Sequence, residues 1–262
     1  MTALAVVMPR RRAAVELTTE QRQLRRVKVV WALLFLNVLS FAGTSSDIII
    51  PVPHKLGQVI TQGALVTAVL LALSVNPRVK VRPSLFLGLY STLALITLMM
   101  SVRFIGLGTT YRAFRLVAFL AVLWLLTPWW KRRDLPLLRT QLKFLTGIMV
   151  SLYLGLAISP SKALTMNAGS RRLGGALWPM PATQVGHYMA ELTGLTILLW
   201  LCRALDRRKA LMLLVPAVVA LLLSHTRTAL VAMVVGLLVA CLSMFSGSRR
   251  VRRALGATAV LV

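Results

Sequence analysis

The sequence lacks the short motifs that mark most soluble enzymes. It contains no glycine-rich phosphate loop, no nucleophile elbow, no zinc-ligand spacing and no internal repeat. Only two cysteines occur, Cys202 and Cys241, and both lie inside apolar runs, which excludes a disulfide framework and a cysteine metal site. We therefore predict no cofactor and no metal, and expect any chemistry to be built from loops and helix ends.

Acidic residues are few, and the charge of the chain is almost entirely basic. Lys and Arg number 31 against six Asp and Glu, for a formal net charge of +25. The basic residues separate apolar runs and form no basic face, so no nucleic-acid partner is expected. Because 58% of the residues are hydrophobic, we predict an integral membrane protein whose basic residues mostly meet anionic lipid headgroups.

Eight apolar runs are long enough, alone or with flanking residues, to cross a bilayer. They cover residues 27–43, 58–75, 84–101, 114–130, 144–159, 182–202, 210–223 and 229–246. The predicted fold class is all-α, a polytopic bundle with a basic cytoplasmic tail at 1–28 and a single transmembrane domain at 29–262. A ninth apolar run stops at Val262, at less than half of the roughly 20 residues that a span needs, so we expect the chain to be incomplete there.

The positions of Lys and Arg predict the orientation. With the N-terminus in the cytoplasm, twenty-three of the 31 basic residues lie inside and eight outside, as the positive-inside bias requires. The outer eight are Lys55, Arg103, Arg112, Arg115, Lys162, Arg171, Arg172 and Arg227. An outer arginine runs against this bias, so these positions are candidates for a functional role.

The outer loop at 169–181 combines Arg171 and Arg172 with paired glycines, including Gly175, and two prolines. This composition predicts a turn-rich loop with close backbone approaches. Such a loop can hold guanidinium groups over a phosphate, which they match bidentately. The alternative is an ordinary outer turn whose arginines meet lipid phosphates.

A second polar break, at 224–228, leaves almost no room for a loop between two apolar runs. Ser224 or Thr226 can cap the helix that begins there. The positive end of the helix dipole disfavours Arg227 in the first turn, unless an anion binds to both sources of positive charge. The alternative is an arginine that extends to the outer headgroups.

Two motifs carry a family resemblance: Arg172-x-x-Gly175 before a proline-containing turn, and Ser-x-Thr-Arg-Thr-Ala-Leu at 224–230. Together they resemble the O-antigen ligase and O-antigen polymerase superfamily, with roughly residues 140–250 covered by motifs and the remainder by hydropathy alone. The resemblance implies a GT-C-like membrane glycosyltransferase in the bacterial inner membrane. Such an enzyme transfers a glycan from a polyprenyl-diphosphate carrier to a glycan, lipid or protein acceptor, without a metal, on the extracytoplasmic face. Ligase and polymerase are not distinguished.

The resemblance also implies roles for particular residues. Arg172 and Arg227 match the arginines that hold the donor diphosphate, and guanidinium groups can stabilise its developing charge without a metal. Arg171 is a weaker candidate. The further candidates for a supporting role are Gly175, Thr226, His187 and Glu191. The family places its histidine base in a large outer loop that would follow Val262. We therefore expect this chain by itself to lack the base and to be inactive.

The remaining candidates are two histidines and a carboxylate. His225 lies two residues from Arg227 and is a weak candidate for the base, with loop polarity as the favoured interpretation. His187 and Glu191 share one face of a helix at i and i+4. We expect Glu191 to pair with His187 or with an outer arginine, as a structural contact in preference to acid–base catalysis.

Other outer arginines leave further alternatives open. Arg103 is expected at the headgroups, whereas Arg112 and Arg115 either extend the anionic donor site or meet headgroups as well. A non-catalytic protein that binds or transports an anionic lipid-linked glycan would use the same arginines. An ordinary solute transporter is disfavoured, because no broken helix or charged midplane pair recurs between the two halves.

Overall fold

The computed structural model describes residues 8–38, 48–50, 53–104, 106–130, 136–167 and 170–246. The chain forms two compact units. Unit 1 comprises Met1–Leu39 and Lys55–Thr140, and unit 2 comprises Ser40–His54 and Gln141–Val262. The predicted ninth apolar run lies outside the described residues.

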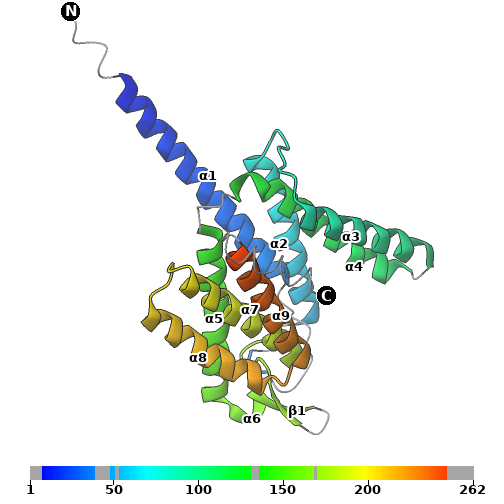
Figure 1. The fold of residues 1–262 in the computed structure, drawn as a ribbon. Helices are drawn as coiled ribbons and strands as arrows, with labels where there is room; N and C mark the ends of the chain where they lie inside the picture. The colour runs from blue at the N-terminus through cyan, green and yellow to red at the C-terminus, as the bar shows by residue number, and fades with distance from the viewer. Residues whose placement is uncertain are drawn as a thin grey trace, which may run out of the picture. The chain divides into compact units, whose positions relative to one another are not determined.

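Helices follow the apolar runs of the sequence (Figure 1). The first four are α1 (Met8–Val38), α2 (His54–Val75), α3 (Leu85–Phe104) and α4 (Leu107–Leu126), which continues into the 3-10 turn η1 (Thr127–Trp129). They are followed by α5 (Pro136–Ile158), α6 (Pro160–Ala163), α7 (Ala182–Leu201), α8 (Arg207–Leu223) and α9 (Arg227–Ser246). Each of the eight predicted apolar runs therefore contains a helix, and α1 begins inside the segment predicted as a basic tail.

Within the described residues, four helices are long and apolar enough to cross a membrane. They are Lys55–Val75, Leu85–Phe104, Leu107–Trp129 and Leu137–Ile158. Helix α8 has 17 residues, and Arg227–Leu242 of α9 forms a shorter apolar helix among the described residues. The structure thus supports a mostly helical protein with membrane-spanning helices, while the larger number of spans stays a prediction.

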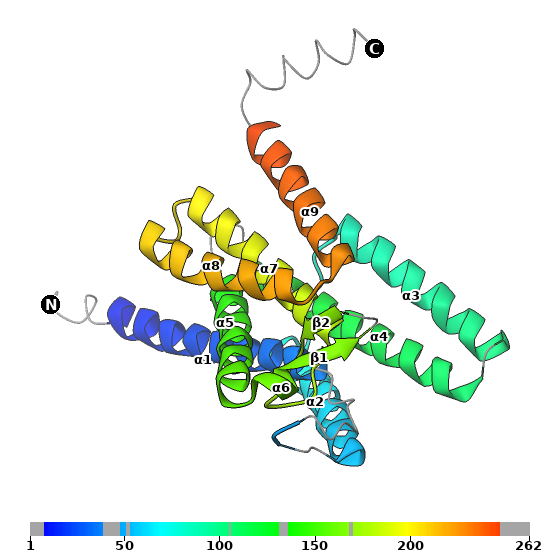
Figure 2. The ribbon, with the colours of Figure 1, turned by 90° about the horizontal axis from the view of Figure 1, so that it is seen from below.

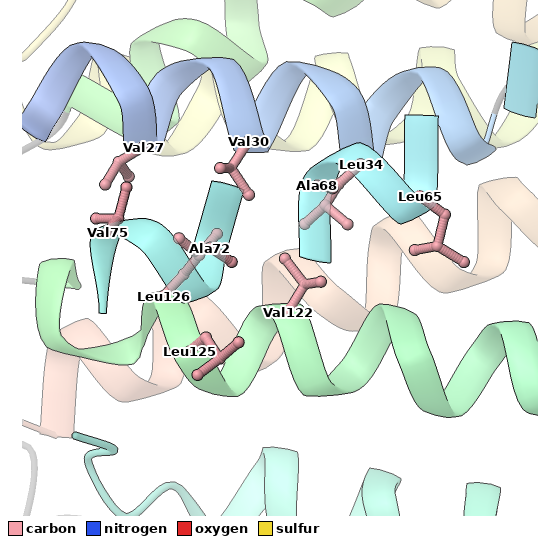
Figure 3. Packing of buried hydrophobic residues seen from close by; sticks show 10 residues of the cluster. All are labelled: Val27, Val30, Leu34, Leu65, Ala68, Ala72, Val75, Val122, Leu125 and Leu126. Carbon is pink, nitrogen blue, oxygen red and sulfur yellow. The ribbon is translucent and has the colours of Figure 1, made fainter. Parts of the chain in front are cut away.

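The core of unit 1 is a seam between α1, α2 and α4 (Figure 3). Its buried side chains recur every three or four residues on each helix, the spacing of one helical face. They are Val27, Val30, Leu34, Leu65, Ala68, Ala72, Val75, Val122, Leu125 and Leu126. The small side chains of Ala68 and Ala72 allow the helices to approach closely.

Polar contacts hold the C-terminal end of α4 in register with its neighbours in unit 1. The buried Asn76 amide, just after α2, donates a hydrogen bond of 3.0 Å to the Leu125 carbonyl. On the other side of α4, the Trp124 indole nitrogen donates to the Ser91 hydroxyl of α3 at 2.9 Å. The face of α4 that meets α1 and α2 is therefore set by packing and by hydrogen bonds together.

Unit 2 contains one β-hairpin among its described residues, which the all-α prediction did not include (Figure 2). Strand β1 (Leu164–Asn167) pairs antiparallel with β2 (Ser170–Leu173), with Thr165 opposite Arg172. The hairpin occupies the predicted outer segment between α6 and α7. The backbone groups of the two strands pair with one another, so the strands satisfy their hydrogen bonds outside the helices.

Candidate functional site

Strand β2 separates the two neighbouring arginines of the predicted outer loop. Successive side chains of a strand point to opposite faces, so Arg172 shares a face with Ser170 and Arg171 shares the other with Leu173. The Arg172 Nε atom donates to the Ser170 hydroxyl at 3.3 Å, and the side chain is half-buried. Arg171 is exposed. The structure thus gives the two arginines different surroundings.

The turn after β2 requires a glycine at position 175. The Gly175 amide donates to the Met180 carbonyl at 2.8 Å, which closes the turn. A Cβ atom on Gly175 would lie 2.6 Å from the Trp178 carbonyl oxygen and 2.8 Å from Met180 Cβ. Space, and not a left-handed backbone, therefore accounts for this glycine, and the close approach predicted from the loop composition is confirmed.

The same turn is anchored to segments distant in sequence. The Ile49 amide donates to the Ala176 carbonyl at 2.8 Å, and the Ile50 amide donates to the Leu177 carbonyl at 3.3 Å. On its other side, Ala176 lies close to Gly155 of α5, where a Cβ atom would be 3.2 Å from Ala176 Cβ. The sequence offered no signal for these contacts, which fix the turn within unit 2.

The junction between α8 and α9 is a buried network of hydroxyl groups. The Ser224 hydroxyl donates to the Leu221 carbonyl at 2.7 Å and lies 3.1 Å from the Thr226 hydroxyl. Thr226 Oγ1 in turn donates to the Ala182 carbonyl at the start of α7, at 3.2 Å. These side chains tie the junction to α7, a contact that the helix capping predicted for them did not include.

Gly186, one turn into α7, makes this contact possible. A Cβ atom on Gly186 would lie 2.8 Å from the Ser224 hydroxyl and closer still to the Thr226 side chain. The backbone of α7 at Gly186 therefore packs directly against the Ser224 and Thr226 side chains, and no space remains for a side chain at position 186. No such role was predicted for Gly186, because an isolated glycine in a helix is only a weak signal of close packing.

Arg227 is exposed and begins α9 directly after this network. The Thr226 carbonyl accepts the first hydrogen bond of the helix, from the Leu230 amide at 3.3 Å. The guanidinium group of Arg227 therefore belongs to the first residue, at the positive end, of a 20-residue helix. An anion at this end would be attracted by both charges.

The strand of Arg172 and the junction of Arg227 rest on the same helices. Strand β2 contacts α7 and α8, and α7 contacts both α8 and α9 (Figure 2). Within the described residues, the ion pair found joins Lys209 to Asp206 at 3.3 Å, so neither Arg172 nor Arg227 has a carboxylate partner there. In the described part of unit 2, Arg172 and Arg227 therefore have no carboxylate partner. Both belong to elements that pack against α7.

Glu191 has a different partner from the one predicted. The Gln141 amide of α5 donates to Glu191 Oε1, whereas the expected partner was His187 or an outer arginine. The i, i+4 spacing makes a contact with His187 possible, but tertiary packing brings a neutral amide of another helix to the carboxylate. His187 is exposed. The prediction that the carboxylate has a structural partner agrees with this contact, although the partner itself was wrong.

His225 is exposed, and its backbone has a φ of 52°, in the left-handed region. This conformation is uncommon for a residue other than glycine and allows the tight turn between α8 and α9. Its amide donates to the Leu222 carbonyl at 3.1 Å. The turn geometry therefore gives His225 a structural role that does not require it to act as a base.

Unit 2 thus combines an arginine on a pinned hairpin, a second arginine at a helix start and a buried network that locks the helices beneath them. Guanidinium groups match the geometry of phosphate and carboxylate groups, so an anion of this kind suits these positions. Comparisons with models of protein families, with curated proteins and with solved structures find no match to this chain.

Proposed function

We propose that this chain binds a polyprenyl-diphosphate-linked glycan through Arg172 and Arg227 on the extracytoplasmic face of the bacterial inner membrane. The observation that carries the proposal is that β2, with Arg172, and α9, with Arg227, both contact α7. Neither arginine has a carboxylate partner in the described part of the chain. Arg172 is half-buried, and an anion that pairs with its guanidinium group offsets the cost of removing this charge from water. Two such groups suit the two phosphates of a diphosphate.

The proposed reaction is glycosyl transfer to an acceptor hydroxyl, as in O-antigen ligases and polymerases. The acceptor oxygen forms a bond to the anomeric carbon while the bond from that carbon to the diphosphate oxygen breaks. The bonding electrons pass to the leaving diphosphate, and the acceptor proton passes to a base. Arg172 and Arg227 stabilise the charge that develops on the leaving group, and the start of α9 adds its dipole.

Rigid mounting of the arginines favours this role. Charge stabilisation is effective when the donors are held in place before the reaction begins. The Ser224 and Thr226 hydroxyl groups lock the backbone directly before Arg227. The Ser170 hydroxyl holds the Arg172 side chain, while the Gly175 turn holds the strand that carries it.

The proposed membrane topology has more spans than the four long apolar helices. Helices α1, α7, α8 and α9 would complete about eight spans with flanking residues, in a GT-C-like arrangement with a cytoplasmic N-terminus. This topology places 164–181 and 224–227 on the outer side. It is the side on which a lipid-linked glycan would be presented.

Binding without chemistry is the second candidate function. One observation favours it: the candidates for acid–base chemistry in unit 2 have structural roles, since Glu191 accepts a hydrogen bond from Gln141 and His225 forms a tight turn. In this case the chain would hold or move an anionic lipid-linked glycan. The arginines would keep the same role.

The test measures binding of undecaprenyl diphosphate to the full chain in nanodiscs. We expect Arg172→Gln and Arg227→Gln each to weaken binding at least about tenfold, since a lost charged hydrogen bond is worth about 1.5–3 kcal/mol. Arg171→Gln is the matched control, because Arg171 lies on the opposite face of β2 and is exposed. Unchanged affinity in both variants would refute the proposed diphosphate site.

A transfer assay then separates the two candidate functions. Membranes containing the protein are supplied with a lipid-linked glycan donor and an acceptor. Transfer that is lost in Arg172→Lys and Arg227→Lys supports the glycosyltransferase, because lysine keeps the charge but not the bidentate geometry. Binding without any transfer by the wild type supports the non-catalytic role.

A further inference from the structure

A pocket in unit 1 contains two of the predicted outer arginines that the proposed diphosphate site does not use. Arg112 and Arg115 of α4 line it together with Asn37 and Val38 at the end of α1. Leu116 and Phe119 complete the lining, and the pocket volume is about 210 Å³. At roughly 30 Å³ per water molecule, this space holds several waters or a phosphate group with the start of an apolar chain.

Arg115 lies half-buried on the face of α4 that packs against other helices, whereas the Arg112 side chain is exposed and lines the same pocket. Seven residues correspond to about two helical turns, so Arg115 shares a face with Val122. Val122 is completely buried. It lies in the seam of α4 with α1 and α2 (Figure 3). By the same spacing Arg112 shares a face with Phe119, which packs against that seam. The pocket therefore continues the seam, and the half-buried Arg115 takes the place of an apolar side chain there.

This position differs from that of an arginine at the lipid headgroups. A headgroup-facing arginine extends outward from the lipid side of its helix. Arg115 is half-buried, and its Nε atom is buried without a hydrogen-bond partner. Arg103 offers a contrast, since it is exposed and its guanidinium group lies 5.6 Å from the centre of the Phe104 ring.

The pocket also lacks a negative charge among the side chains that the structure describes. Glu191 and Asp206 are the acidic residues with described side chains, and both belong to unit 2 with partners of their own. Arg112 and Arg115, at i and i+3, would repel each other without an anion between them. A buried, unpartnered guanidinium nitrogen adds a further cost that a hydrogen-bond acceptor would remove.

The walls of the pocket indicate which kind of anion fits. Val38, Leu116 and Phe119 are apolar, and the Asn37 amide is held by a hydrogen bond of 2.8 Å to the Thr61 carbonyl of α2. With the predicted topology, the end of α1 and the start of α4 both lie at the outer surface of the membrane. We propose that this pocket binds the phosphate of an anionic lipid, with its apolar chain against Val38, Leu116 and Phe119. This site is separate from the proposed diphosphate site, and its test does not depend on that function.

The test uses the full chain in neutral detergent and measures thermal unfolding during titration with three probes. These are dioleoyl phosphatidylglycerol, dioleoyl phosphatidylcholine and inorganic phosphate. We expect phosphatidylglycerol to raise the unfolding midpoint of the wild type more than phosphatidylcholine does, because only the former has a net negative charge. The apparent affinity for phosphatidylglycerol should fall at least about tenfold in Arg115→Gln and also in Arg112→Gln.

Controls make each outcome decisive. Arg103→Gln removes a predicted outer positive charge that does not line the pocket, and it should respond as the wild type does. Equal responses of the wild type to both lipids would overturn the proposal without any variant, so a misfolded Arg115→Gln does not prevent the test. Full stabilisation by inorganic phosphate alone would instead assign the pocket to free phosphate and overturn the lipid assignment. An unchanged phosphatidylglycerol response in folded Arg112→Gln and Arg115→Gln would also overturn it.

Discussion

Gly186 of α7 and Thr226, just before α9, are in such close contact that a methyl group on Gly186 would overlap the Thr226 side chain. The contact joins the start of α7 to the helix that carries Arg227. Protein interiors tolerate little overpacking, so a larger side chain at position 186 or 226 would displace the junction between α8 and α9. This contact therefore links the stability of unit 2 to the position of a proposed ligand-binding arginine.

Replacement of Gly186 by alanine should destabilise the protein by about 1–3 kcal/mol, the usual cost of overpacking. The measurement is thermal or denaturant-induced unfolding in detergent micelles. Gly194→Ala is the matched control, because Gly194 lies in the same helix and a Cβ atom there would meet no atom within 4 Å. The control should be neutral or slightly stabilising, since alanine favours a helix by up to about 1 kcal/mol over glycine. Equal effects of both substitutions would contradict the close contact.

Thr226→Val should cost about 1 kcal/mol of stability and weaken diphosphate binding as well. Valine keeps the shape of threonine but loses the hydroxyl that donates to Ala182 and contacts Ser224. The Ala182 carbonyl and the Ser224 hydroxyl then lose a partner, and the backbone before Arg227 is held less firmly. Thr228→Val serves as the control, because Thr228 is exposed in the first turn of α9. Wild-type binding by Thr226→Val would separate the network from the ligand site.

Gly175→Ala should disrupt the turn after β2, because its Cβ atom would meet the Trp178 carbonyl oxygen at 2.6 Å. A backbone atom cannot move aside as a flexible side chain can, so we expect a loss of about 1–3 kcal/mol. Limited proteolysis of this loop reports the change locally, and unfolding in detergent reports it globally. Gly147→Ala in α5 has open space around it and provides the comparison. Resistance of Gly175→Ala to proteolysis at the wild-type level would argue against this geometry.

Glu191→Gln should leave diphosphate binding and any transfer activity close to the wild-type level. The substituted amide still offers an oxygen to the Gln141 Nε2 donor, so the contact between α5 and α7 survives. Glu191→Leu removes the acceptor and should destabilise the protein, since Gln141 then loses this partner. Transfer abolished by Glu191→Gln, in a protein that folds and binds normally, would assign the carboxylate a catalytic role.

Hydropathy was sufficient to predict helices, because the helical runs are long and their composition differs sharply from that of the breaks. Helix ends were harder to predict. The predicted basic tail continues as helix from Met8, since Arg and Gln are good helix formers and nothing in the sequence interrupts them beyond Pro9, in the first turn. The hairpin at 164–173 was missed because its strands have four residues each, too short for a clear alternation of polar and apolar side chains.

In the candidate site, too, local features could be predicted from the sequence, whereas contacts between distant segments could not. The glycine at position 175 could be assigned to a close approach from its setting among turn residues, and the structure confirms it. Partners distant in sequence could not be assigned in this way. Glu191 has a histidine at helical spacing, yet it accepts a hydrogen bond from Gln141, which lies on another helix. Spacing along one helix shows which contacts are possible, but not which competing partner is nearer in space.

The sequence by itself determined the helical segments, the predominance of basic charge and the arginines predicted to lie outside, because hydropathy and the positive-inside bias act on local composition. Tertiary structure alone decided how those positions are used. It placed Arg171 and Arg172 on opposite faces of a strand and brought Thr226 against Gly186 of α7. It also set the half-buried Arg115 on the packed face of α4, with the exposed Arg112 lining the same pocket. The physical reason is that packing and hydrogen bonds between distant segments depend on which surfaces meet, and local composition does not specify this.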